Sequence, residues 1–342
     1  MTKKLPLQTV LIVGLGSIGK RHLDNIRHIR PEMKIVALRR KYSKTDPAYD
    51  ADFVVNSIKD ALVYNPDLAI IANPSSLHIS TALPLARAGV HLFIEKPISS
   101  SIKDVEKLIS LAKKNNCKLM VGYNLRFSES LKFFRKEILN QKIGKILSIR
   151  SEVGQNLESW RPKNKYVEGV SAKKELGGGV LLELSHEFDY LSWIFGPINW
   201  VSGYITKQSN LEINVEDIAH CLLGFKEKNQ DIVANVSLDF IRLDHIRQCT
   251  VVGEFGSLRW NGIKNSVELY SKNQSKWSLS FQDQENKDFT YQQEVSHFLE
   301  CILNKKMPLI SGESALDTLN VIECIRRSSS EGKRFQVNYE GN

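Results

Sequence analysis

The sequence lacks the paired cysteines of a disulfide framework or of a structural zinc site. Its 342 residues include five cysteines, an odd number, and none belongs to a C-x-x-C pair. They are far apart in the chain, at Cys117, Cys221, Cys249, Cys301 and Cys324. Reduced and mostly buried thiols, as in a cytoplasmic protein, fit this pattern better.

Long hydrophobic runs are also missing, since a membrane-spanning helix needs about 18 or more apolar residues in a row. The apolar stretch 10–13 follows Lys3 and Lys4 and loosely imitates a signal peptide. It runs directly into glycines, and no small-residue cleavage pattern follows. We therefore expect a buried strand here, a cytoplasmic protein and no membrane partner.

The charge is unbalanced, because 47 lysines and arginines exceed 38 acidic residues and give a formal net charge of +9. The basic residues are spread along the chain and interleave with acidic ones, and no recognised nucleic-acid-binding motif is present. We therefore expect no nucleic-acid partner. A phosphorylated cofactor or substrate is a better use of the positive excess.

The length suggests two domains, and the first alternates strands and helices. Capping-box patterns at 57–60 and 101–104 predict helix starts. Short connections between alternating elements predict an α/β fold with a doubly wound parallel sheet. We assign 1–124 to a dinucleotide-binding Rossmann domain, with strands at 9–14, 34–38, 53–55, 68–72, 91–94 and 118–123.

The remainder, 125–342, is predicted to be an α/β domain with a large, mainly antiparallel open sheet. One helix is expected at 180–195. The alternation in 232–240 leaves one semi-polar sheet face, so we expect a homodimer or homotetramer joined through strands between Trp200 and Phe281. The predicted strands are 146–153, 200–206, 218–225, 232–240, 247–252, 257–260, 267–270 and 277–281.

A glycine-rich motif follows the first predicted strand and opens a helix, which is the context that dinucleotide binding needs. Gly14 permits the tight turn, Gly16 lets the backbone approach a pyrophosphate, and Gly19 lets the helix pack closely on the strand. The helix N-terminus then faces the phosphates. The cofactor-binding motif is Gly14, Leu15, Gly16, Ser17, Ile18 and Gly19.

The second predicted strand ends in Leu38-Arg39-Arg40, where an NAD-preferring domain usually carries an acidic residue for the ribose 2′-hydroxyl. A guanidinium group can bind a 2′-phosphate through two hydrogen bonds. Arg39 and Arg40 therefore predict that NADP is favoured over NAD.

Further motifs lie after the predicted strands and before a predicted helix. Glu95-Lys96-Pro97 comes directly after the fifth strand, and a triple glycine, 177–179, opens a later helix. Together with the glycine-rich motif, these elements resemble the glucose–fructose oxidoreductase / inositol dehydrogenase (Gfo/Idh/MocA) family over nearly the whole chain. The other matching segments are Asn73-Pro74-Ser75-Ser76-Leu77-His78 and Gly122-Tyr123-Asn124-Leu125-Arg126-Phe127.

The resemblance implies that Lys96 lies near the substrate oxygen, often before a cis proline. An ammonium group can stabilise an oxygen that gains charge, and a desolvated lysine can exchange a proton. His186 matches the family histidine and suits proton transfer near neutral pH. The family aspartate is absent, because the acidic residue is Glu183, three positions before His186; on a continuous helix both would share a face with Tyr190.

The expected function is therefore hydride transfer between nicotinamide and a secondary alcohol or ketone of a carbohydrate-like substrate. Segment 160–166 and the Ser185-His186-Glu187 variant suggest a sugar, sugar phosphate or nucleotide sugar. A non-catalytic dinucleotide sensor and a redox-neutral enzyme with permanently bound cofactor remain alternatives. No metal is expected, because the histidines have no ligand spacing. The further cofactor residues are Asn73, Pro74, Ser76, His78, Glu95, Lys96 and Asn124, and the substrate residues are Lys96, Asn124, Arg126, Arg161, Tyr166, Glu183 and His186.

Overall fold

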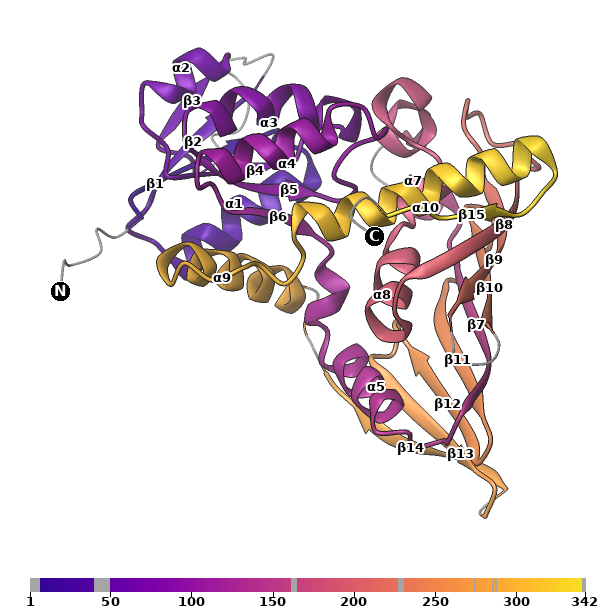
Figure 1. The fold of residues 1–342 in the computed structure, drawn as a ribbon. Coiled ribbons are helices and arrows are strands. Elements are labelled where there is room, and N and C mark those ends of the chain that lie inside the picture. The colour runs from indigo at the N-terminus through magenta and orange to yellow at the C-terminus, as the bar shows by residue number, and fades with distance from the viewer. Residues whose placement is uncertain are drawn as a thin grey trace. The chain divides into compact units, whose positions relative to one another are not determined.

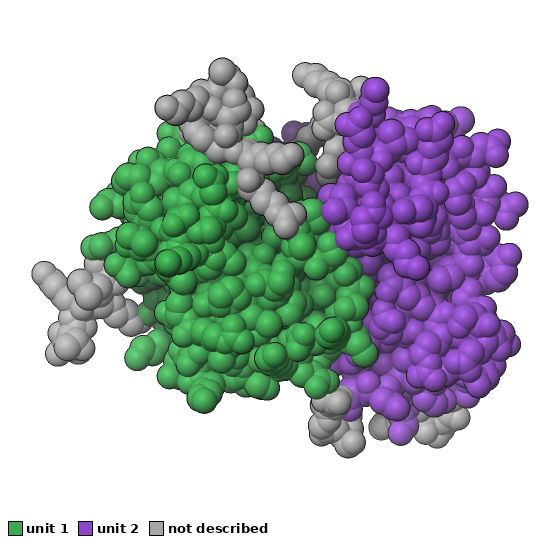
Figure 2. Space-filling model, turned by 90° about the horizontal axis from the view of Figure 1, so that it is seen from above, with its two compact units in different colours: residues 1–124, 287–316 green, residues 125–286, 317–342 purple. Residues whose placement is uncertain are grey.

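The computed structural model describes residues 7–39, 50–160, 165–226, 231–273, 275–284, 286 and 288–339. The chain forms two compact units (Figure 2): unit 1 is Met1–Asn124 with Lys287–Leu316, and unit 2 is Leu125–Asn286 with Asp317–Asn342. The first boundary falls after Asn124, where the sequence placed it. Segment 287–316 belongs to unit 1, although the sequence grouped it with the second domain.

Unit 1 contains a parallel six-stranded sheet in the order β3-β2-β1-β4-β5-β6. This is the predicted doubly wound arrangement. The central strands β1 and β4 are buried at every position, because a parallel sheet is covered on both faces. The strands are β1 (Thr9–Val13), β2 (Lys34–Leu38), β3 (Phe53–Val55), β4 (Leu68–Ile71), β5 (His91–Glu95) and β6 (Leu119–Gly122).

The helices of unit 1 cover both faces of its sheet. Figure 1 shows α1 and α9 on one face and α3 and α4 on the other. The first capping prediction is confirmed, since Ser57 accepts a hydrogen bond from the Asp60 backbone at 3.1 Å. The second is wrong, because α4 begins only at Val105: Asp104 occupies its N-cap position with φ +60°, and its side chain makes no capping hydrogen bond. The helices are α1 (Ser17–Ile29), α2 (Ile58–Leu62), α3 (His78–Arg87), α4 (Val105–Lys114) and α9 (Phe289–Leu303).

Unit 2 is built on a nine-stranded sheet in the order β14-β13-β12-β11-β7-β10-β9-β8-β15. Among the described strands of this sheet, β7 and β10 pair in parallel and the other pairs are antiparallel. All the predicted strands are present, and β15 is an addition. They are β7 (Ile146–Gly154), β8 (Ile198–Thr206), β9 (Ile218–Phe225), β10 (Ile232–Asp239), β11 (Ile246–Gly253), β12 (Gly256–Asn261), β13 (Ser266–Ser271), β14 (Lys276–Gln282) and β15 (Phe335–Gln336).

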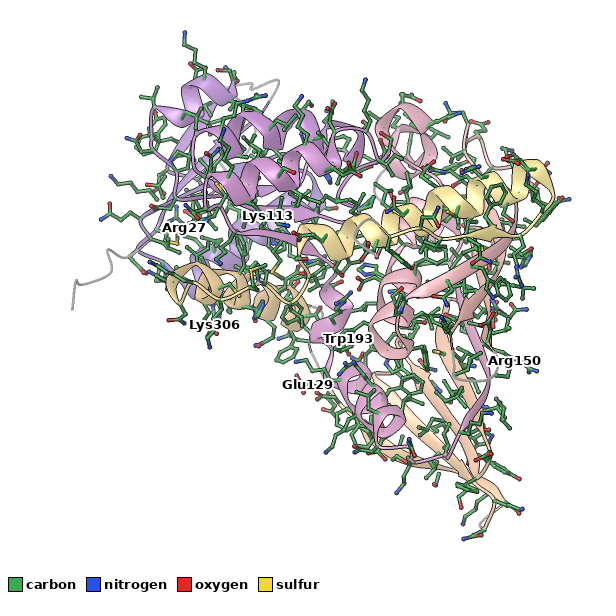
Figure 3. The ribbon with its side chains drawn as sticks, in the orientation of Figure 1. Arg27, Lys113, Glu129, Arg150, Trp193 and Lys306 are labelled. Carbon is green, nitrogen blue, oxygen red and sulfur yellow. The ribbon has the colours of Figure 1, made fainter. Side chains whose placement is uncertain are left out.

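The two faces of this sheet differ. Along β10 the residues alternate between buried and accessible, and Val236 and Leu238 belong to the buried side. The accessible side carries Tyr204 and Leu222, which are 62% and 41% exposed. Arg150, labelled in Figure 3, lies opposite Asn235 on this same face. The outer face is therefore a mixed polar and apolar surface in the isolated chain.

Helices cover the inner face, and one of them corrects a prediction. The sequence predicts a single helix over 180–195, but the structure has α7 and α8 with a break at Leu184 and Ser185. Glu183 and His186 therefore do not share one continuous helical face.

The remaining helical elements lie mostly in unit 2, but η1 is in unit 1, and both α10 and η2 cross a unit boundary. They are α5 (Glu129–Leu139), α6 (Leu157–Trp160), α7 (Val180–Glu183), α8 (His186–Phe195), α10 (Gly312–Glu331), η1 (Ser75–Leu77), η2 (Asn124–Phe127), η3 (Tyr166–Glu168), η4 (Val170–Ala172) and η5 (Lys174–Leu176).

The cysteines agree with the reading from the sequence. All five are free, and only Cys324 is partly accessible. Burial raises the pKa of Cys221 and Cys249 to about 12, so these thiols stay protonated and unreactive. Among the helices that the structure describes, none is long and apolar enough to cross a membrane.

Candidate active site

The glycine-rich turn after β1 has the geometry that the motif predicts. Gly14 has φ +87°, a region that favours glycine, and a Cβ there would lie 2.8 Å from the Asn73 backbone nitrogen. A Cβ on Gly19 would lie 1.9 Å from the Gly14 carbonyl oxygen, so the helix packs directly on the turn. Gly16 faces open space within 4 Å. Gly14 and Gly19 thus shape the turn, and Gly16 leaves room beside it.

That room lies at the N-terminus of α1. Gly16 caps the helix, and Ser17 and Ile18 form its first turn. Within the described residues no side chain caps this end, and its first turn has no acidic residue. Unpaired backbone N–H groups and the helix dipole favour a phosphate at such an end. The residues present therefore fit the pyrophosphate of a dinucleotide.

The end of β2 lies beside the same turn. The Gly14 backbone N–H donates to the Leu38 carbonyl at 3.1 Å, which places Arg39 next in the chain after that contact. The Arg39 backbone in turn donates to the Val55 carbonyl at 3.0 Å, and its side chain is partly accessible. Arg40 lies outside the described residues.

The segment after β4 is tied to the segment after β5 by His78. This histidine is 1% exposed, with Nε2 2.8 Å from the Asn73 carbonyl and Nδ1 3.0 Å from the Pro97 carbonyl. Burial lowers the pKa of His78, against an opposite effect of the two carbonyls. Both ring nitrogens are thus engaged within the protein, which makes His78 a clamp for two loops. Pro74 and Ser76 lie on the intervening loop and are partly accessible.

Lys96 lies in a similarly fixed turn. Glu95 accepts a hydrogen bond from the Lys96 backbone N–H at 3.2 Å through Oε2, and the Lys96–Pro97 peptide is cis, as expected. The Glu95 Oε1 atom lies 2.5 Å from Nε2 of the buried His22 on α1. Glu95 is 7% exposed, whereas Lys96 is partly accessible. Glu95 therefore supports the turn from beneath, and Lys96 extends from it.

His22 is a residue that the sequence reading missed. It lies three positions after Gly19 in the same helix, but its partner Glu95 is 73 positions away in the chain. A lone histidine on a predicted helix carries no signal of such a partner. Asn124, predicted from the sequence, is 8% exposed and donates from Nδ2 to the Thr290 hydroxyl at 2.8 Å.

The predicted residues of unit 1 share one edge of its sheet. Because parallel strands all end at the same edge, segments that follow β1, β2, β4, β5 and β6 lie there together. In doubly wound folds ligands bind at this carboxyl edge. The residues brought to it are Gly14, Gly16, Ser17, Ile18, Gly19, Arg39, Asn73, Pro74, Ser76, His78, Glu95, Lys96 and Asn124.

In unit 2, Arg126 is part of a buried ion pair. Its Nε and Nη2 atoms donate to the two carboxylate oxygens of Asp189 at 2.9 and 2.7 Å. The side chains are 7% and 1% exposed. Burial raises the pKa of Asp189, and the Arg126 guanidinium offsets this only in part. Arg126 thereby links η2 to α8, a structural contact that its prediction as a substrate residue did not include.

His186 begins α8 and is 8% exposed, while Glu183 ends α7 and is partly accessible. Glu216 holds the start of α7, since its carbonyl accepts from Val180 at 3.1 Å and its carboxylate accepts from Leu181 at 3.4 Å. Burial raises the pKa of Glu216. Glu216 is a second residue that the sequence reading missed, because its contact joins distant parts of unit 2.

The remaining predicted substrate residues divide between described and undescribed parts. Tyr166 is partly accessible, and its hydroxyl accepts a hydrogen bond from the Glu212 backbone at 3.2 Å. Arg161 lies outside the described residues. Its neighbour Trp160 packs edge-on against Phe240 with ring centroids 5.3 Å apart.

Two family models match this chain. Residues 8–123 match the NAD-binding Rossmann fold of an oxidoreductase family, and residues 135–338 match the C-terminal α/β domain of that family. The chain belongs to the Gfo/Idh/MocA oxidoreductase family. This confirms the resemblance drawn from the sequence, and with it an NAD-binding oxidoreductase built from a Rossmann domain and a mainly antiparallel α/β domain.

Relatives of this oxidoreductase match it along its length. The myo-inositol 2-dehydrogenase of Thermotoga maritima is 23% identical over 340 residues, covering 95% of this chain and 97% of the relative. The WlbA dehydrogenase of Bordetella pertussis, solved with NADH and UDP-GlcNAcA, superposes with a TM-score of 0.81 at 20% identity, covering 97% and 98%. A levoglucosan dehydrogenase solved with NADH superposes with a TM-score of 0.85 at 17% identity, covering 97% of this chain and 99% of that one. These structures share the fold.

Proposed function

We propose that this oxidoreductase interconverts a secondary alcohol and a ketone on a carbohydrate-like substrate. The observation that carries this is the position of Lys96. It follows β5 at the same sheet edge as the glycine-rich turn after β1, with only β4 between the two strands. Neighbouring strands are about 4.8 Å apart, so the two strand ends are separated by roughly 10 Å. A dinucleotide held at the turn can span that distance.

The residues then take the following roles. A nicotinamide dinucleotide held by the glycine-rich turn would supply the hydride acceptor in oxidation and the hydride donor in reduction. In reduction the Lys96 ammonium donates a hydrogen bond to the carbonyl oxygen, which gains negative charge as the hydride arrives. In oxidation His186, or Lys96 as its neutral amine, takes the hydroxyl proton, since histidine and lysine both serve as general bases.

We infer the substrate class from the relatives and from the accessible polar residues of unit 2. The relatives are named for an inositol and an anhydrosugar, and one was solved with a nucleotide sugar. Glu183 and Tyr166 are partly accessible and can donate to or accept from hydroxyl groups. A sugar, sugar phosphate or nucleotide sugar fits this surface, with Asn124, Arg126 and Arg161 as further proposed contacts.

We further propose that NADP(H) is the preferred cofactor, because Arg39 stands beside the glycine-rich turn where a carboxylate would select NAD. Arg40 would act with it. The proposal goes beyond what the relatives establish, since the two solved structures described above contain NADH.

A substrate screen tests the proposed function. Purified protein is mixed with polyols, sugars, sugar phosphates and nucleotide sugars and with NAD⁺ or NADP⁺, and reduced nicotinamide is followed by absorbance. We expect turnover with at least one of these classes. Cofactor binding without turnover on any of them would point to a sensor. Cofactor that copurifies, resists dialysis and returns to its starting redox state would point to redox-neutral catalysis.

We also propose a homo-oligomer, dimer or tetramer, that buries the outer sheet face of unit 2. Tyr204 and Leu222 are exposed apolar groups on a surface that an isolated sheet leaves open to water. Closed two-fold symmetry is the commonest way to cover such a surface. Light scattering at micromolar concentration should give a multiple of the 38.9 kDa chain mass. A monomer mass would contradict the proposal.

A further inference from the structure

Three titratable side chains meet in the interior of unit 1. His22 on α1, Glu95 at the end of β5 and Glu294 on α9 bring their ring nitrogen and carboxylate oxygens within 4.8 Å of one another. His22 and Glu294 are fully buried, and Glu95 is 7% exposed. Burying charged groups is costly unless they are paired or neutralised. The reaction described above uses neither His22 nor Glu294.

Glu95 is held at both carboxylate oxygens. Oε1 lies 2.5 Å from His22 Nε2, and Oε2 accepts from the Lys96 backbone N–H at 3.2 Å. Among the described residues, His22 Nδ1 is buried without a hydrogen-bond partner. A proton on Nδ1 would be an unpaired buried donor, so the neutral ring with its proton on Nε2 is favoured. His22 is therefore the donor and Glu95 the negatively charged acceptor.

The short contact favours a shared proton over a metal ion. Two ligands of a tetrahedral zinc lie about 3.4 Å apart, given metal–ligand distances near 2.1 Å. His22 Nε2 and Glu95 Oε1 are closer than that, at 2.5 Å. A hydrogen bond accounts for this separation, and a common metal ion does not.

Glu294 completes the cluster, with a carboxylate oxygen within 4.8 Å of the His22 and Glu95 atoms. Neither of its oxygens has a hydrogen-bond partner among the described residues. Burial, together with the negative charge of Glu95, raises the pKa of Glu294 well above its ordinary value. A second negative charge here would lie beside that of Glu95, and Arg21, next to His22 in α1, already pairs with Asp288 at 2.8 Å.

The side chains packed around the cluster come from α1, α3, β5 and α9. Phe93 of β5 and Tyr291 of α9 contact the His22 ring edge-on, with centroids 5.2 and 6.2 Å away. His78 of α3 lies close enough to Glu95 to feel its charge. Among the described residues, the charged or titratable groups around the cluster are thus Arg21, His22, His78, Glu95, Asp288, Tyr291 and Glu294, with Lys96 on the adjoining turn.

We propose that Glu294 is a positioning residue: as a neutral acid it lets Glu95 keep its charge and both hydrogen bonds, and so fixes the turn that presents Lys96. This rests on the proposed function in one respect, the role of Lys96. Loss of the Glu294 proton at alkaline pH places two buried negative charges side by side. Glu95 is then displaced, the Lys96 backbone loses its acceptor, and turnover falls.

A pH profile of turnover tests this with matched variants. Glu294→Gln keeps the shape and is neutral at every pH, so it should lose the alkaline decrease that the wild type shows. Glu300→Gln, an exposed position on the same helix, should follow the wild type. His22→Phe removes the donor to Glu95 and should lower kcat by about ten- to a hundred-fold with little change in cofactor affinity, as a misplaced catalytic group does.

The pH dependence of stability tests whether Glu294 carries a proton, without any measurement of activity. Above the ordinary glutamate pKa of 4.5, the folded state binds a proton that the unfolded state has lost. The free energy of unfolding must then fall as pH rises, until the raised folded pKa is passed. Thermal unfolding between about pH 5 and pH 9 should therefore show a stability advantage of Glu294→Gln over wild type that grows with pH.

Two results would overturn the proposal, and a third would refute the proposed function instead. Parallel pH profiles of unfolding for wild type and Glu294→Gln would overturn it, because Glu294 would then be charged. So would one equivalent of a transition metal in the purified wild type that Glu294→Gln lacks. Full turnover of Lys96→Ala would refute the proposed function instead, and the unfolding data would still decide the proton on Glu294.

Discussion

The two units differ in how much of each candidate site is set by backbone groups. In unit 1 the glycine-rich turn is shaped by backbone contacts, since Gly19 packs on the Gly14 carbonyl. The His78 ring lies within hydrogen-bond distance of the carbonyls of Asn73 and Pro97, and the His22–Glu95 pair is the side-chain exception. In unit 2 the key positions are set by paired side chains, with Asp189 binding Arg126 as the clearest example.

This difference explains how such a protein can keep one cofactor and vary its substrate. A turn made of glycines and backbone N–H groups recognises a pyrophosphate, which is the same in every nicotinamide dinucleotide. A site whose helices are held by side-chain pairs changes shape when one pair is exchanged. Unit 1 is thus suited to a constant ligand, and unit 2 to a variable one.

The largest expected effect is on unit 2. Asp189→Ala leaves the Arg126 guanidinium buried without its carboxylate, which should lower the free energy of unfolding by about 3–5 kcal/mol. Chemical denaturation measures this. Glu331→Ala, which breaks exposed pairs with Arg327 and Lys333, is the control and should cost about 1 kcal/mol or less. Equal effects of the two changes would mean that the buried pair does not hold unit 2 together.

The next effect concerns the proposed proton transfer. If Lys96 and His186 have the roles proposed above, Lys96→Ala and His186→Ala should each lower turnover by about a hundred-fold or more. Cofactor affinity should change little. Lys114→Ala and His28→Ala, which alter exposed residues of the same types, are the controls. Full turnover in either active-site variant would remove that residue from the mechanism.

A smaller effect concerns whether the Arg39 side chain sets the preference of the unit 1 site for NADP(H) over NAD(H). A bidentate charged hydrogen bond contributes about 1.5–3 kcal/mol. NADP(H) should therefore bind roughly ten- to a hundred-fold more tightly than NAD(H), and Arg39→Ala should remove most of that preference without weakening NAD(H). Titration calorimetry with both cofactors decides it. A wild type that binds NAD(H) as tightly or more tightly contradicts the proposal.

The sequence predicted what depends on local pattern. The glycine spacing predicted the turn and helix around Gly14 and Gly19, and the alternation in 232–240 predicted which side of β10 is buried. Both follow from neighbours in the chain, so no distant contact was needed to infer them.

What the sequence did not predict depends on contacts between distant residues. The break between α7 and α8 interrupts a helical pattern, and Glu216, which fixes the start of α7, lies more than thirty positions after it. Asp189 and Arg126 are 63 positions apart. The grouping of α9 with unit 1 has the same cause, because an amphipathic helix does not specify which core it covers.

The most direct test of the account is calorimetric titration of the wild type, Gly16→Ala and Gly19→Ala with NADH and NADPH. The wild type should bind one dinucleotide per chain. Gly16→Ala adds a methyl group in open space, so stability should hold while affinity falls about tenfold or more; Gly19→Ala collides with the Gly14 carbonyl and should lose about 1–3 kcal/mol of stability. No binding of either dinucleotide by the wild type, or unchanged affinity in Gly16→Ala, would contradict the assignment of this turn as the cofactor site.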